Sequence, residues 1–297
     1  MSDAYRVLIF LNGNRGLRVL SALASSQHEI VGVVWHGENI EVDSIRRVSG
    51  PQTPILKVTV GQWGPVEDLA KTLNPDVGVV AGFSFLVPQA LFEYARFGFV
   101  NLHAGALPKY RGGSPLNWQL INGEPIAGVS VLEMTCGLDD GRVVGSDEIP
   151  IGEFDTIKDL HEMAESCFIV LISQILDNLP SALANALPQS EADACYWHQR
   201  SDADGRIRVW QQSAVEVERM VRALTFPYPG AWVERSGEMI RLFEVRIPRH
   251  KYSGTPGRVV RLKGENPILI LREGSLELMK WNLPLGVKEL ANGDFIT

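Results

Sequence analysis

Asn101 and His103 stand one residue apart at the end of the apolar run 97–102, and a segment rich in Gly, Pro and polar residues follows them. If the run is a β-strand, both side chains leave the same face of the sheet, because strand side chains alternate between faces. A hydrogen-bond donor and a base would then converge. A lone histidine is more often structural than catalytic, but this pairing at a strand end, before a polar loop, favours chemistry.

The elements that would position this pair follow an alternating α/β pattern. We expect helices at 17–25 and 66–73 and apolar strands at 5–11, 28–35, 76–83 and 97–102. Strand, turn, helix and strand within about thirty residues form a βαβ unit. The fold class is therefore α/β, with a Rossmann-like, mostly parallel sheet and helices on both faces. The first turn lacks the G-x-G-x-x-G spacing, so classical NAD binding is disfavoured.

The chain after residue 200 shows a different pattern. A helix at 214–224 precedes five short strands separated by turns, which predicts a small open β-barrel of the OB type. We therefore expect a Rossmann-like catalytic domain at 1–200 and an OB-like domain at 201–297. Basic residues cluster at 241–251. A solvated face is the usual explanation for such a cluster, and contact with nucleic acid is the alternative.

Composition and charge limit the function. The 297 residues are 45% hydrophobic and 21% charged, as in ordinary globular enzymes, and the net charge of −7 argues mildly against a large nucleic-acid surface. The three widely spaced cysteines give neither a disulfide framework nor a zinc site, so we expect no metal. The sequence shows no signal peptide and no apolar run near the ~20 residues of a membrane-spanning helix. We expect a cytoplasmic protein without membrane contact.

Several separated motifs occur in an order that is specific to one enzyme family. They are Asn101-Leu102-His103, Leu107-Pro108-Lys109-Tyr110-Arg111-Gly112, Pro115-Leu116-Asn117-Trp118, Leu138-Asp139-Asp140-Gly141, Asp204-Gly205-Arg206-Ile207 and Pro227-Tyr228-Pro229-Gly230-Ala231. On these motifs the chain resembles the folate-dependent formyltransferases over nearly its whole length.

The resemblance implies transfer of a formyl group from 10-formyltetrahydrofolate to an amine, with no metal. Attack of an amine on the formyl carbon creates an oxyanion and a cationic nitrogen. By similarity, Asn101 and His103 would stabilise the oxyanion, and His103 would also be the natural general base. Asp139 would orient the imidazole. The family places its aspartate two residues before a glycine, which favours Asp139 over Asp140. The residue that makes the proton transfer stays open.

The resemblance also implies a binding pocket for the folate. Its predicted residues are Phe85, Leu86, Val87, Gly137 and Asp139. In the family, the first three line the pterin pocket largely through backbone groups. On periodicity alone, a hydrophobic loop that caps the core is the stronger interpretation of 84–88. Gly105 is a departure, because many members of the family have serine there and the hydroxyl group is missing in this chain.

The residues expected to bind the amine substrate are Asn14, Arg15, Tyr110, Arg111, Asn117 and Trp118. Asn14 and Arg15 lie in the first βα turn, where a helix N-terminus and a guanidinium could meet a phosphate. A solvated turn explains these two residues equally well. Arg111 and Trp118 match the family motif, but they could instead fix the loop and fill space.

The loop after the second strand separates the candidate substrates. Methionyl-tRNA formyltransferases carry a basic insertion there, whereas residues 36–43 of this chain are acidic and would repel phosphate. The motifs at 115–118 and 204–207 are more similar to those of nucleotide-sugar N-formyltransferases that act on 4-amino sugars, although Arg208 replaces a common aspartate.

We therefore expect two small-molecule partners, folate and a nucleotide-linked amino sugar used in the biosynthesis of surface polysaccharides. Nucleic acid is disfavoured as a partner, and a homodimer is compatible with the sequence. The alternatives are a methionyl-tRNA formyltransferase, a hydrolase of formyltetrahydrofolate, and a non-catalytic module that binds nucleotide sugar or folate.

Overall fold

The computed structural model describes residues 3–37, 40–286 and 288–297. It divides into two compact units, and each unit consists of three separate segments of the chain. Unit 1 contains residues up to 112, 128–149 and 162–196; unit 2 contains 113–127, 150–161 and 197–297. Two segments before residue 200, 113–127 and 150–161, also belong to unit 2. The expected division into domains at 1–200 and 201–297 therefore stays a prediction.

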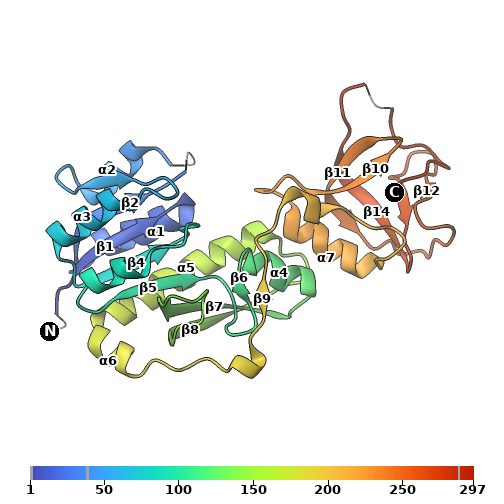
Figure 1. Ribbon diagram of the computed structural model, residues 1–297. Coiled ribbons are helices and arrows are strands. Elements are labelled where there is room, and N and C mark those ends of the chain that lie inside the picture. Colours follow the sequence, from blue (N-terminus) through green and yellow to red (C-terminus); the bar gives the residue numbers. More distant parts are fainter. Residues whose placement is uncertain (1–2, 38–39, 287) are drawn as a thin grey trace. The chain divides into compact units, whose positions relative to one another are not determined.

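A seven-stranded sheet with the order β3-β2-β1-β4-β5-β7-β8 forms the centre of unit 1 (Figure 1). β1 pairs in parallel with β2 and β4, β2 with β3, and β4 with β5, whereas β7 is antiparallel to β5. The prediction of a mixed α/β fold with a mostly parallel sheet is confirmed. The strands are β1 (Arg6–Leu11), β2 (Glu29–Trp35), β3 (Ile55–Lys57), β4 (Val77–Ala81), β5 (Phe99–His103), β7 (Ile126–Glu133) and β8 (Val143–Pro150).

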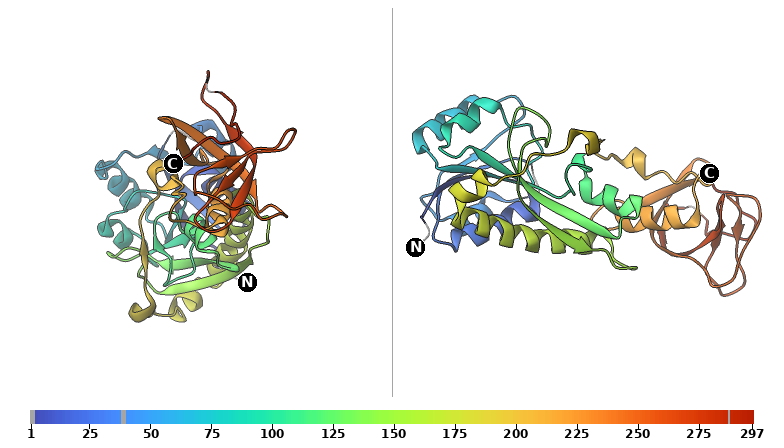
Figure 2. Two further views of the ribbon diagram at one scale, coloured as in Figure 1. Left: turned by 90° about the vertical axis from the view of Figure 1, so that its right-hand side faces the viewer. Right: turned by 90° about the horizontal axis from the view of Figure 1, so that it is seen from below.

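Helices cover both faces of this sheet (Figure 2). On one face, Leu8 and Phe10 of β1 share a hydrophobic cluster with Val66 of α3. On the other face, α1 approaches so closely that a Cβ atom at Gly16 would lie 2.7 Å from the Cβ atom of Leu11. The helical elements are α1 (Gly13–Ala24), α2 (Val42–Ser49), α3 (Gly64–Leu73), η1 (Gln89–Tyr94), α5 (Ile157–Asp177), α6 (Leu179–Ala184) and η2 (Glu191–Asp193).

The acidic segment after β2 differs from the expected loop. Val42 and Asp43 begin α2 instead, and Arg46 and Arg47 lie in its last turn, where basic side chains complement the helix dipole. Glu38 and Asn39, which contributed to the expectation of an acidic loop, lie outside the described residues.

Unit 2 contains a five-stranded antiparallel sheet with the order β10-β11-β14-β13-β12. The antiparallel strands that we expected after residue 200 are present, but the order leaves β10 and β12 at the two edges, and the OB-type barrel stays a prediction. The elements are α4 (Pro115–Asn122), η3 (Asp202–Gly205), α7 (Ala214–Leu224), β10 (Ala231–Arg235), β11 (Glu238–Arg246), β12 (Val259–Val260), β13 (Ile268–Ile270) and β14 (Ser275–Asn282).

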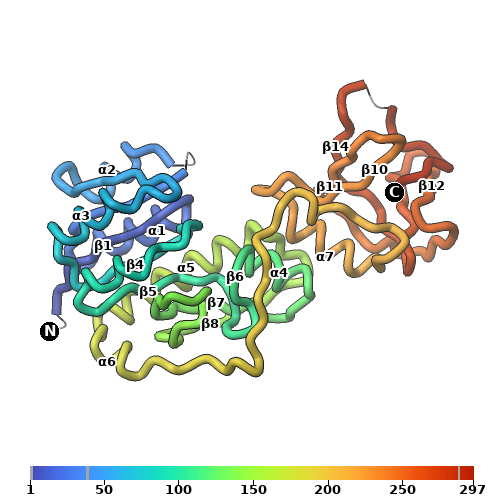
Figure 3. Tube along the Cα trace, viewed as in Figure 1, coloured from blue at the N-terminus to red at the C-terminus, as the bar shows by residue number. Residues whose placement is uncertain are grey.

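A long connection leads from α6 to a small two-stranded sheet formed by β6 (Arg111–Gly112) and β9 (Tyr196–Trp197) (Figure 3). Leu187 in this connection exchanges two backbone hydrogen bonds with Val143 of β8, at 2.8 and 2.9 Å. The connection is therefore held against the edge of the central sheet. None of the described helices has the length and apolar character needed to cross a bilayer.

Candidate active site

The loops that follow β1, β4 and β5 lie side by side at the carboxyl-terminal ends of the strands of the central sheet, because these three strands are adjacent and parallel. The N–H of Asn12 donates to the carbonyl of Ala81 at 3.2 Å, which joins the first two loops. Gly82 has a φ of +68°, and a Cβ atom there would lie 2.7 Å from the carbonyl oxygen of Asn12. This close approach requires glycine.

Asn101 and His103 both face the carboxylate of Asp139. The amide Nδ2 of Asn101 donates to Asp139 Oδ1 at 3.3 Å, and His103 Nδ1 lies 3.4 Å from Asp139 Oδ2. The N–H of Gly112 also donates to Oδ2, at 2.9 Å. The side chains of His103 and Asp139 are only 6% and 12% exposed. A buried carboxylate with this environment can hold an imidazole in place and balance a positive charge on it.

The other ring nitrogen of His103 contacts the backbone. His103 Nε2 lies 2.6 Å from the carbonyl oxygen of Tyr110. Because a carbonyl oxygen only accepts, Nε2 carries the proton of this hydrogen bond. Both ring nitrogens thus face acceptors, and these contacts fix the orientation of the ring.

Gly105 is required by this arrangement of His103. A Cβ atom at Gly105 would lie 2.6 Å from both His103 Nε2 and the carbonyl oxygen of Tyr110. The serine of many family members therefore has no room here unless the ring or the loop shifts. The carbonyl of Gly105 accepts from the Ser130 hydroxyl at 2.9 Å, which fixes the loop to β7.

Asp139 and its neighbour Asp140 face different partners. The Asp140 carboxylate accepts from the Thr135 hydroxyl within its own turn, and Asp140 is exposed. Gly137 belongs to the same turn, where its N–H donates to the Thr135 hydroxyl at 3.1 Å. Of the two aspartates, the structure brings only Asp139 to Asn101 and His103.

The loop predicted to line the pterin pocket, 85–87, presents its side chains in different directions. Leu86 is 79% exposed, whereas Val87 is 9% exposed and belongs to the hydrophobic cluster. Phe85 stacks on the ring of His36 with a centroid distance of 4.0 Å. His36 Nε2 accepts from the N–H of Ser84 at 3.1 Å, and burial lowers the pKa of His36. A neutral His36 therefore holds the loop, and Leu86 is an apolar side chain available to a ligand.

Two of the residues predicted to bind the amine are buried in unit 1. The side chain of Tyr110 is 4% exposed, and that of Arg111 is fully buried. Arg111 donates to Gln189 at 2.9 Å, to Glu191 at 2.8 Å and to the hydroxyl of Tyr196 at 2.7 Å. The pairing with Glu191 raises the pKa of Arg111. Arg111 thus fixes the loop, which is the alternative that the sequence left open, and its binding of the amine substrate stays a prediction.

Asn14 and Arg15 pack toward helix α5. The amide of Asn14 donates to Glu165 at 3.1 Å, and Arg18 donates to the same carboxylate at 2.8 Å. The guanidinium of Arg15 lies 5.3 Å from the ring centroid of Phe168. Asn14 and Arg15 therefore support the packing of α1 on α5, and their binding of a substrate phosphate stays a prediction.

Asn117 and Trp118 belong to unit 2. Asn117 is 2% exposed and donates to the carbonyl of Ala223 at 2.8 Å, so its side chain is a buried link between α4 and α7. The role of Asn117 in binding the amine substrate stays a prediction. Trp118 donates to the carbonyl of His198 at 3.0 Å and lies 4.9 Å, between ring centroids, from Trp197. Trp118 is partly exposed, and its role in binding stays a prediction.

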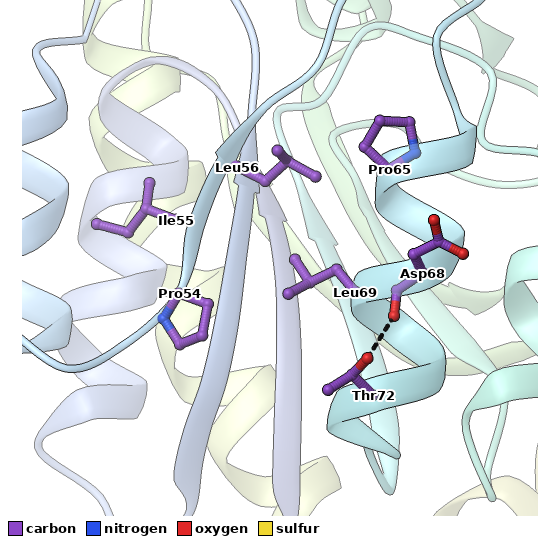
Figure 4. A pocket seen from close by; sticks show the side chains of 7 residues that line it. All are labelled: Pro54, Ile55, Leu56, Pro65, Asp68, Leu69 and Thr72. Atoms are coloured by element: carbon purple, nitrogen blue, oxygen red, sulfur yellow. Dashed lines mark hydrogen bonds between the residues drawn. The ribbon is translucent and has the colours of Figure 1, made fainter.

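A separate pocket of about 330 Å³ lies between β3 and α3 (Figure 4). Its lining consists of Pro54, Ile55, Leu56, Pro65, Asp68, Leu69 and Thr72. None of the predicted site residues lines this pocket, so it is not the candidate active site. Among the described residues, no group of three His, Cys, Asp or Glu side chains is arranged to hold a metal ion.

Residues 5–174 match the family "Formyl transferase", and residues 200–294 match "Formyl transferase, C-terminal domain". The chain belongs to the formyl transferase family. A methionyl-tRNA formyltransferase of Geobacter metallireducens is 34% identical over 243 residues, which cover 82% of this chain and 76% of that protein. These matches confirm the predicted enzyme class, a folate-dependent formyltransferase.

Solved structures of low sequence identity share the fold of this formyltransferase. HypX from Aquifex aeolicus in complex with tetrahydrofolic acid has a TM-score of 0.68 at 20% identity over 99% of the chain, which spans only 51% of that protein. An N-formyltransferase from Helicobacter canadensis, in complex with folinic acid and dTDP-3-aminofucose, has a TM-score of 0.66 at 16% identity, with coverage of 92% and 98%.

The prediction of a nucleotide-sugar substrate is wrong. Six relatives of this formyltransferase, 28–34% identical over 76–83% of the chain, are all methionyl-tRNA formyltransferases. The prediction depended on the motifs at 115–118 and 204–207 and on the acidic segment 36–43. Part of this segment lies outside the described residues, and part of it begins α2. The composition of one short segment does not determine the substrate.

Three residues that contact the candidate site had no signal in the sequence. Gln189 bonds to the turn of Asp139, Glu165 anchors Asn14, and His36 supports the loop 84–85. Their partners are 50, 151 and 48 residues away along the chain. No local motif encodes contacts over such separations.

Proposed function

We propose that this chain transfers the formyl group of 10-formyltetrahydrofolate to the amino group of methionyl-tRNA. The observation that carries the proposal is the 34% identity to a methionyl-tRNA formyltransferase over 82% of the chain. The environment of Asn101, His103 and Asp139 supports it, because an amide, an imidazole and a carboxylate are the groups that acyl transfer to an amine needs.

Asn101 and His103 have separate roles in this reaction. The amide of Asn101 uses one N–H for Asp139 and keeps the second for the oxyanion that develops when the amine attacks the formyl carbon. His103 lies beside this amide with Nδ1 facing Asp139, whose carboxylate balances the positive charge that the ring gains. The new C–N bond forms as the bond to the folate nitrogen breaks. The amine loses a proton, and the folate nitrogen gains one.

Two features of the site fit a folate as the donor. Leu86 offers an exposed apolar side chain in the loop after β4, and this strand pairs with β5, which carries Asn101 and His103. The neighbouring Phe85 is fixed by its stacking on His36. An apolar wall beside a few placed polar groups is typical of sites for flat, partly apolar ligands.

The charge of the chain is unevenly distributed, which supports a nucleic-acid substrate. Residues 201–297 contain 15 Lys and Arg against 12 Asp and Glu, whereas residues 1–200 contain 13 against 23. The carboxyl-terminal part therefore carries a net charge of +3 (15 − 12) within an acidic protein, and a charge asymmetry of this sign is compatible with nucleic-acid binding. The net charge of −7 for the whole chain therefore does not argue against a nucleic-acid substrate. The cytoplasmic location and the homodimer stay predictions.

The test is direct formylation. We expect the protein to convert methionyl-tRNA into formylmethionyl-tRNA when 10-formyltetrahydrofolate is supplied, with a KM for the tRNA that rises steeply with salt. His103→Ala is expected to abolish turnover, whereas Asp140→Asn, a change in the same turn as Asp139, is expected to retain it. A protein that consumes 10-formyltetrahydrofolate with free amines but never with methionyl-tRNA would overturn the proposal.

A further inference from the structure

Asp139 adopts a left-handed backbone conformation, which is uncommon for residues other than glycine although aspartate tolerates it better than most. Its φ is +52°, in the left-handed region that glycine adopts freely and other residues adopt only rarely. The same residue presents its carboxylate to Asn101 and His103. This conformation costs some free energy in a residue that has a Cβ atom, and contacts from outside the turn offset that cost.

Gln189 makes those contacts with both hydrogens of its amide group. Its Nε2 donates to the carbonyl of Asp139 at 2.8 Å and to the carbonyl of Gly141 at 2.7 Å. One side chain thus holds the turn at two positions, Asp139 and Gly141.

The orientation of the Gln189 amide has only one solution. Its Oε1 accepts from Nε of Arg111 at 2.9 Å, and a guanidinium can only donate. The two carbonyl oxygens can only accept, so the NH₂ group must face them. Arg111 is fully buried and is itself held by Glu191 and Tyr196. The next residue, Gly112, donates its N–H to the Asp139 carboxylate.

We infer that Gln189 is a positioning residue for formyl transfer, which holds the left-handed turn so that the Asp139 carboxylate faces Asn101 and His103. The inference rests on the proposed roles of these three residues. Gln189 belongs to the connection between α6 and β9, and it acts on the reaction only through Asp139.

The most selective change is Gln189→Glu. The carboxylate keeps the length of the side chain and an acceptor for Arg111, but it turns an oxygen toward the carbonyls of Asp139 and Gly141 in place of the NH₂ group. We expect kcat to fall roughly 10- to 100-fold, because a misplacement on the order of 1 Å at a reacting group has effects of this size. The KM values for both substrates should stay near those of the wild type. Gln174→Glu, the same change at an exposed position of α5, is the control and should leave kcat unchanged.

A double-mutant cycle separates positioning from a general structural role. If Gln189 acts through Asp139, Gln189→Glu has no further effect on kcat in an Asp139→Asn background. An equal loss of kcat in both backgrounds would overturn the inference. Gln189→Asn, which shortens the side chain, provides a second variant if Gln189→Glu does not fold, and the melting temperature of each variant shows whether it does.

Nuclear magnetic resonance of the free protein tests the geometry without any amine substrate. In Gln189→Glu, the imidazole ¹⁵N signals of His103 and the amide signal of Gly112 should shift, because both groups contact the Asp139 carboxylate. Unchanged signals would overturn the inference. If the wild-type protein does not formylate methionyl-tRNA, the proposed function fails, and these spectra still decide whether Gln189 positions Asp139.

Discussion

Replacing Asp139 with asparagine removes one negative charge from the candidate site and leaves its shape almost unchanged. His103 Nδ1 lies 3.4 Å from the carboxylate, and both side chains are largely buried. At this separation and an effective dielectric constant of about 20, the attraction between a carboxylate and an imidazolium is about 5 kcal/mol. If the ring gains its charge in the transition state, losing this attraction slows the step by roughly a thousandfold or more.

Formylation at saturating concentrations of both substrates measures this effect, since kcat then reports the step in which the ring gains charge. We expect Asp139→Asn to reduce kcat about a thousandfold with little change in melting temperature, because the new amide oxygen can still accept from the N–H of Gly112. Asp140→Asn is the matched control, since its carboxylate faces Thr135. A kcat for Asp139→Asn within about tenfold of the wild type would refute the charge-balancing role of Asp139.

Three further predictions follow from contacts described above. Gly105→Ala places a Cβ atom 2.6 Å from His103 Nε2 and the carbonyl of Tyr110, so kcat should fall while circular dichroism shows a folded protein; unchanged kcat would contradict the need for glycine. Burial lowers the pKa of His36 below its ordinary value of 6.5. As the pH falls, the unfolded chain therefore binds a proton at this histidine before the folded protein does. The contribution of His36 to the free energy of unfolding is fully present above pH 6.5 and decreases below it. We measure the free energy of unfolding by urea denaturation between about pH 7 and pH 5 and expect it to decrease less in His36→Gln than in the wild type. An identical decrease in both proteins would contradict a lowered pKa of His36. Asn117→Ala leaves a buried carbonyl without its donor and should cost about 1–3 kcal/mol of unfolding free energy, measured by the same method; a cost near zero would show that water replaces the amide.

The arrangement of unit 1 could be predicted because its strands are apolar runs that end in turn residues. β1 ends at Leu11, and Asn12 follows it as the N-cap of α1, where its side chain accepts from the N–H of Gly13. Asn101 and His103 could be placed on one face because strand side chains alternate. Helix α2 could not be predicted from the sequence, because it starts with acidic residues and only Ile45 of this helix is buried, so its apolar periodicity is weak.

The roles of polar residues in the motifs could not be read from the sequence. Asn117 and Arg111 look like substrate ligands, but Asn117 bonds to a carbonyl 106 residues away and Arg111 bonds to side chains 78–85 residues away. A buried polar side chain and an exposed one have the same letter in a sequence, and only the fold shows which groups they contact. The choice of substrate depended on two short motifs, 115–118 and 204–207, and on the charge of one short segment, and none of these determined the substrate.

The division of each unit into three chain segments has a consequence for the engineering of this enzyme. A fragment that ends near residue 200 would still contain α4, but it would lack α7 and the carbonyl of Ala223 that Asn117 needs. Such a fragment would expose a helix whose apolar side chains pack against a segment that is absent, and we expect it to aggregate when expressed alone. Hybrid enzymes made by joining the amino-terminal part of one relative to the carboxyl-terminal part of another would contain both helices, but they would assemble unit 2 from segments of two different proteins. Exchanging a whole unit between relatives instead requires matched crossovers at all five boundaries between the segments, after residues 112, 127, 149, 161 and 196.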